Sequence, residues 1–134
     1  MLLLLHLDAN LQYSYVAAGD ENVITEEYGF IGGGFKNSVD GAYGVVTGGY
    51  KNQALSNYAT IIGGFLNVVT GRFSTVAGGA RNNARGRWSF AAGYKADAQK
   101  DHSAAFGFNG DDCVASDENQ MVFCADSVRV IPLR

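Results

Sequence analysis

Apolar and polar positions recur along this chain at intervals of fourteen or fifteen residues. An apolar column lies at Val16, Ile31, Val46, Ile61, Val76, Ala91 and Ala105. An aromatic column lies three residues before it, at Tyr13, Tyr28, Tyr43, Tyr58, Phe73 and Trp88, and ends in His102. Glycine recurs at Gly19, Gly34, Gly49, Gly64, Gly79, Gly93 and Gly107, and asparagine at Asn22, Asn37, Asn52, Asn67 and Asn82. Because self-similarity at a fixed period is typical of repeat proteins, we predict about seven stacked coils over residues 13–115.

Each repeat contains two short extended segments joined by glycine. In one unit, residues 58–62 and 65–69 alternate with the period of a strand, and Gly63–Gly64 lies between them. A helix is disfavoured because each interior glycine would cost about 1 kcal/mol. Two strands per coil, with coils stacked about 4.8 Å apart, predict an all-β fold, a flattened parallel β-solenoid of 14–15-residue coils. We expect glycine at its corners, where tight bends need a positive φ.

The repeats leave a short segment at each end of the chain. We expect residues 1–12 to form an N-terminal cap strand and residues 116–134 to form C-terminal capping strands. The leucine run near the N-terminus has no basic residues before it, so we interpret it as a strand and not as a secretory signal. The sequence has no apolar stretch long enough to cross a bilayer, and we expect no membrane insertion by this segment.

The two strands of each coil differ in the polarity of their outer faces. In the second strand the outward positions are polar, whereas the first strand is apolar on both sides. Its inward column places Ile61 and Val76 in the core. The outward positions that we expect to lie against another copy of the chain are Phe30, Val45, Thr60, Thr75, Phe90 and Ala92. A strand that is apolar on both sides is normally buried on both sides, which predicts self-association through this sheet.

Composition narrows the class of protein. Eighteen glycines with one proline, among 47% hydrophobic residues, fit neither collagen nor a disordered linker. The net charge of −3 gives no field that would attract nucleic acid, and we expect no nucleic-acid partner. Catalysis has little support, since the only histidines are His6 and His102 and the segment GFIGGGF lacks the lysine and hydroxyl residue of a phosphate loop.

The two cysteines and the acidic residues near the C-terminus lie where the repeat fades. Cys113 and Cys124 either form a disulfide that closes the C-terminal cap or remain two unpaired cysteines. Acidic residues cluster at Asp111, Asp112, Asp117 and Glu118. They suggest either a calcium loop or a solvated loop, and their spacing departs from the EF-hand pattern. Two cysteines without a nearby histidine are too few for zinc, and we expect no metal and no cofactor.

Two columns have both a structural and a binding interpretation, and a third has a structural one. Basic side chains recur at Lys36, Lys51, Arg81 and Lys95. They either contact an anionic glycan or form a soluble edge that resists aggregation. The aromatic column either stacks as a ladder at a corner or offers a platform for sugars, while the asparagines are expected to hydrogen-bond along the rod. An ice-binding face is disfavoured because Thr47, Thr60 and Thr75 do not share one column.

The repeats resemble a known family of surface proteins. The spacing Ser89-x-Ala91-x-Gly93-x-x-Ala96-x-Ala98 is similar to the head repeat of trimeric autotransporter adhesins, the YadA-like head. The units YATIIGGFLNVVTG and FSTVAGGARNNARG resemble its glycine-rich variant. This resemblance implies a left-handed parallel β-roll, a homotrimer and an extracellular or cell-surface location. It also implies adhesion to a host-surface or matrix glycan or protein, or a structural role in a fibre, and no catalysis.

Overall fold

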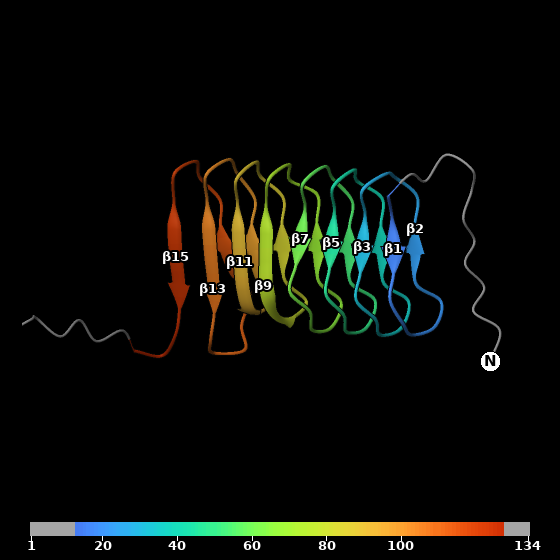
Figure 1. Cartoon of the computed structure of the whole chain (residues 1–134). Helices are drawn as coiled ribbons and strands as arrows, with labels where there is room; N and C mark the ends of the chain where they lie inside the picture. The colour runs from blue at the N-terminus through green and yellow to red at the C-terminus, as the bar shows by residue number, and fades with distance from the viewer. Residues whose placement is uncertain (1–12, 128–134) are drawn as a thin grey trace, which may run out of the picture.

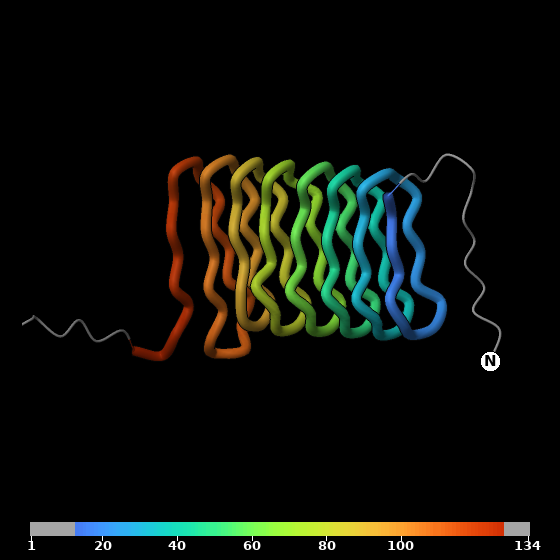
Figure 2. The backbone as a smooth tube through the Cα atoms, in the orientation of Figure 1, coloured from blue at the N-terminus to red at the C-terminus, as the bar shows by residue number. Residues whose placement is uncertain are grey.

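The computed structural model describes residues 13–127, which form two parallel sheets stacked face to face (Figure 1). The first sheet contains β1 (Tyr15–Val16), β3 (Phe30–Ile31), β5 (Val45–Val46), β7 (Thr60–Ile61), β9 (Thr75–Ala80), β11 (Phe90–Tyr94), β13 (Ala104–Gly107) and β15 (Met121–Cys124). The second contains β2 (Val23–Ile24), β4 (Ser38–Val39), β6 (Gln53–Ala54), β8 (Val68–Val69), β10 (Asn83–Ala84), β12 (Ala96–Ala98) and β14 (Cys113–Ala115). The chain alternates between the sheets and advances by one coil at each circuit (Figure 2). The predicted parallel β-solenoid of about seven coils is therefore confirmed.

The strand register follows the columns seen in the sequence. Thr60 pairs with Thr75 and Ile61 with Val76, fifteen residues apart. Both Ile61 and Val76 are fully buried between the sheets, as predicted. The coil length falls from fifteen to fourteen at β11, where the register shifts between Ala91 and Gly93. The extra residue of the fifteen-residue coil is thus accommodated by a local shift in register, and the column of core residues continues without interruption.

A ladder of buried asparagines connects successive coils. The Oδ1 of Asn52 accepts a hydrogen bond from the backbone N–H of Asn67, at 3.1 Å. Its Nδ2 donates to the carbonyl oxygen of Gly48 in its own coil, at 3.0 Å, and to that of Gly64 in the next, at 2.9 Å. The same pattern repeats at Asn37 and at the later asparagines, which are fully buried. The expected hydrogen bonding along the rod is confirmed, and it satisfies backbone groups that the turn would otherwise leave unpaired.

The expectation of glycine at the corners is wrong for two of the bends. One bend is formed by the aromatic column, with Tyr43 at φ 60°, and another by the basic column, with Lys51 at φ 51°. Glycine is instead required where coils approach each other most closely. A Cβ on Gly49, at φ 99°, would collide with the carbonyl oxygen of Gly64 in the next coil. At the bends formed by the aromatic and basic columns, the side chains of Tyr43 and Lys51 are exposed, so a larger residue fits there.

The described residues cover only part of the two predicted terminal segments. The cap strand expected at residues 1–12 lies outside them. At the other end, β15 falls within the predicted segment 116–134 and pairs with β13 as the last strand of the first sheet. Within residues 13–127 no helix is long and apolar enough to cross a membrane.

Replacing Asn52 by alanine should lower the free energy of unfolding by about 3 kcal/mol, because it leaves the buried Asn67 N–H and the partly buried Gly48 carbonyl without partners. The matched control is Gln53→Ala, which removes an exposed side chain from the neighbouring position and should have little effect. Urea denaturation of both variants measures the difference. Equal losses in the two would show that the ladder does not hold the coils together.

Candidate interaction surfaces

The outer face of the first sheet is apolar along its whole length. One outward column contains Tyr15, Phe30, Val45, Thr60, Thr75, Phe90, Ala104 and Met121. A second, two residues further on in each strand, contains Ala17, Gly32, Thr47, Ile62, Ala77, Ala92, Phe106 and Phe123. We call these two columns the apolar face. All six residues predicted to contact another copy lie on it, and neither column contains a charged residue.

Aromatic side chains enlarge this face at its border. The rings of Phe35 and Tyr50 stack with centroids 5.7 Å apart, and those of Tyr50 and Phe65 with centroids 5.3 Å apart. Phe106 and Phe123 stack at 4.7 Å within the apolar face itself. The Phe35–Tyr50–Phe65 ladder is not among the predicted columns, although its fifteen-residue spacing is present in the sequence.

The predicted aromatic column stacks along one bend of the solenoid. Tyr28 and Tyr43 have centroids 4.6 Å apart and planes that differ by 2°. The stack continues to Trp88 and His102, whose centroids lie 5.0 Å apart. Because each ring face covers the next, the faces that a sugar would stack on are already occupied. The geometry favours the ladder over the sugar platform.

The basic column is not a continuous stripe of free positive charge. Lys36 Nζ lies 3.2 Å from a carboxylate oxygen of Glu21, and Lys95 Nζ lies 3.4 Å from one of Asp112. Leu66 takes the place of a basic residue in the middle. The two ion pairs reduce the repulsion expected between stacked cations. They also weaken the case for an anionic glycan spanning the whole column.

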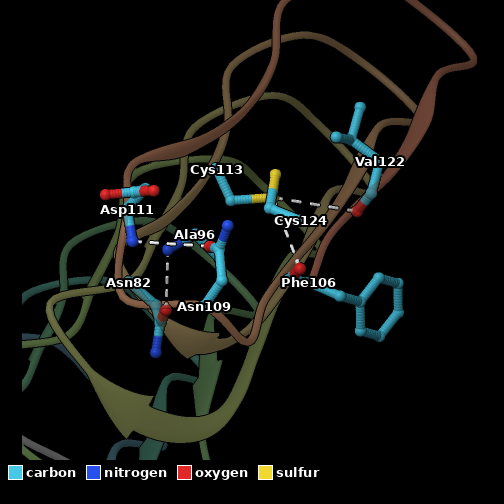
Figure 3. Close-up of a disulfide and its surroundings, with 8 residues drawn as sticks. All are labelled: Asn82, Ala96, Phe106, Asn109, Asp111, Cys113, Val122 and Cys124. Carbon is cyan, nitrogen blue, oxygen red and sulfur yellow. Dashed lines mark hydrogen bonds between the residues drawn. A yellow bond between two sulfur atoms is a disulfide. The ribbon is translucent and has the colours of Figure 1, made fainter. Parts of the chain in front are cut away.

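A disulfide joins Cys113 on β14 to Cys124 on β15, with Cα atoms 5.5 Å apart (Figure 3). Cys113 pairs with Ala96, whose N–H donates to the Oδ1 of Asn82 at the end of the asparagine ladder. Cys124 pairs with Gly107. The bond therefore links the two sheets in the last coil at the position where asparagine and glycine link them in earlier coils.

The remaining candidate residues do not converge on a catalytic or metal site. Asp111 donates its N–H to Asn109 Oδ1 at 3.4 Å, within the exposed loop before β14 (Figure 3). Among residues 13–127 no group of three or more histidine, cysteine, aspartate or glutamate side chains could hold a metal ion. His102 stacks on Trp88, and His6 lies outside the described residues.

Comparison with known proteins adds no relative: no protein-family model matches the chain, and no curated protein matches it. The chain's function has therefore to follow from its fold and its surfaces.

Reducing the disulfide should lower the free energy of unfolding by about 2–3 kcal/mol, because the last coil loses its covalent closure. Amide exchange in β14 and β15 should rise more than in β3–β10. The Cys113→Ser/Cys124→Ser variant serves as the control and should not respond to reductant. Identical melting of the wild type with and without reductant would contradict a stabilising role.

The tyrosine ladder should weaken the fold at alkaline pH. Desolvation by the neighbouring coils raises the pKa of Tyr43 above its ordinary value of 10.0, and Tyr28, Tyr58 and Glu27 add to the shift through repulsion. The folded state thus favours the protonated phenol. Its contribution is complete below the ordinary pKa and is lost as the pH rises through the raised pKa. Urea midpoints measured at neutral and strongly alkaline pH should fall less in Tyr43→Phe than in the wild type; an equal fall would contradict this assignment.

Proposed function

We propose that this chain is a non-enzymatic structural or adhesive module of a cell surface or fibre, which works as a homotrimer. Its three solenoids pack through their apolar faces around a common axis. The observation that carries this proposal is the apolar face, which continues over all eight strands of the first sheet.

The exposure of large side chains on this face supports a partner. Ile62 is 55% exposed, Phe123 49% and Met121 63%. Soluble monomers rarely expose a continuous apolar patch of this extent. A second copy of the chain carries the same face, and closed cyclic assemblies are the common way to cover a surface with copies of itself.

The opposite face of the solenoid does not need such cover. On the second sheet Arg85 pairs with Asp97 at 2.8 Å. Thr25 Oγ1 donates to a carboxylate oxygen of Asp40 at 3.0 Å. This face mixes such polar groups with the exposed side chains of Val23 and Val114, whereas the apolar face carries no charged residue. This asymmetry favours a closed assembly over sheet stacking without limit.

Two further observations support the assignment of three copies and of a location outside the cytosol. The resemblance of the repeats to YadA-like heads favours three copies and a cell-surface or extracellular role. The Cys113–Cys124 disulfide agrees with an oxidising compartment, since such bonds are rare in the cytosol.

The wild-type chain should have three times the 14.2 kDa mass of one chain when measured by light scattering. Thr75→Lys should dissociate or aggregate the assembly, because it places like charges in the middle of the apolar face near the axis. Gln53→Lys, on the outer face of the second sheet, is the matched control and should keep the wild-type mass. A wild type that is monomeric at micromolar concentration, with a well-behaved Thr75→Lys variant, would overturn the proposal.

A further inference from the structure

The outer face of the second sheet carries an open hollow near its C-terminal end, with a volume of about 230 Å³. Its floor consists of Asn83 on β10, Asp97 on β12 and Val114 on β14, which lie in register on neighbouring strands. Arg81 and Lys95, both from the basic column, line it as well. Arg85 also lines it and is not among the predicted binding residues, because no other basic residue shares its column.

Two of the three cations that line the hollow have a carboxylate partner. Arg85 Nε lies 2.8 Å from Asp97 Oδ1, although the N–H does not point at the oxygen and no hydrogen bond forms. Lys95 pairs with Asp112 at 3.4 Å. Among residues 13–127, Arg81 makes no ion pair. The hollow therefore holds one uncompensated positive charge, carried by an exposed guanidinium.

The floor adds a polar and an apolar contact. The side-chain amide of Asn83 is partly exposed and makes no hydrogen bond with the described residues, so its donor and acceptor groups are both available. Val114 is 39% exposed on the far side of Asp97, two strands from Asn83. A ligand matched to these groups has one anionic group, neighbouring hydroxyls and a small apolar surface.

We propose that this hollow binds an acidic sugar residue. Its carboxylate or sulfate lies against the Arg81 guanidinium, which can hold two oxygens at once. A ring hydroxyl hydrogen-bonds to the Asn83 amide, and the C–H groups of the adjoining sugar ring cover Val114, two strands away. A sugar ring carries hydroxyls on its rim and C–H groups on its faces, which suits a shallow hollow lined in this way.

The site is independent of the proposed assembly. It lies on the second sheet, whereas the apolar face belongs to the first, on the opposite side of the solenoid. Three solenoids packed through their apolar faces would each leave it open to solvent. Failure of the trimer and failure of sugar binding are therefore separate outcomes.

Calorimetric titration of the full chain with a sulfated, uronate-containing disaccharide from heparin, at low ionic strength, tests the proposal. Arg81→Gln should raise the Kd roughly tenfold or more, because it removes a charge-assisted hydrogen bond. Lys51→Gln, in the same basic column but outside the hollow, should change the Kd by no more than about twofold. Equal weakening by both variants, or no binding by the wild type, would overturn the proposal.

A second measurement does not depend on any variant folding. Amide shifts in the wild type should change most at Arg81, Asn83 and Val114 when the disaccharide is added, and little at Lys36 or Lys51. Inorganic sulfate should bind more weakly than the disaccharide. If inorganic sulfate, or an acidic peptide of equal charge, binds as tightly as the disaccharide, the sugar assignment is overturned.

Discussion

From Asn37 to Asn82, each coil of this solenoid depends on a buried amide that bonds both to its own turn and to the next. Two thin sheets leave no room for water inside, yet the chain must turn there and bury backbone N–H and C=O groups. Asn52 solves this with one side chain, which accepts from Asn67 and donates to Gly48 and Gly64. The same contact sets the local spacing, because a neighbouring glycine has to let the next coil approach without a Cβ.

Regular stacking also gives the molecule two unlike sides. On the first sheet the outward columns repeat one kind of chemistry along the rod, so a preference that is weak in one coil becomes a continuous apolar face over eight strands. On the second sheet the outward residues vary from coil to coil, and single residues form the Arg85–Asp97 ion pair and line an open hollow. Self-association and ligand binding can therefore occupy opposite sides without competing.

The sequence allows the architecture to be predicted because register in a solenoid is the repeat itself. Once Ile61 and Val76 are aligned fifteen residues apart, their pairing and burial follow. Features that depend on a single residue are not predictable in this way. The Lys36–Glu21 pair arises because one coil has an acid where the next has a lysine, and Arg85 stands alone in its column. The positive φ of Tyr43 was missed because glycine was expected at every bend, whereas only close backbone contact requires it.

The disulfide at the last coil has a consequence for the length of the molecule. Because the fifteen-residue coils present the same bonding groups to their neighbours, one whole unit added between two of them would lengthen the rod by about 4.8 Å and leave both neighbouring interfaces unchanged. The bond between Cys113 and Cys124 is not part of that repeating contact, and it closes the coil at which the array ends. Length and closure are thus separate properties of this chain. Duplication of a unit can change the distance that the rod spans, while the same covalent end is retained.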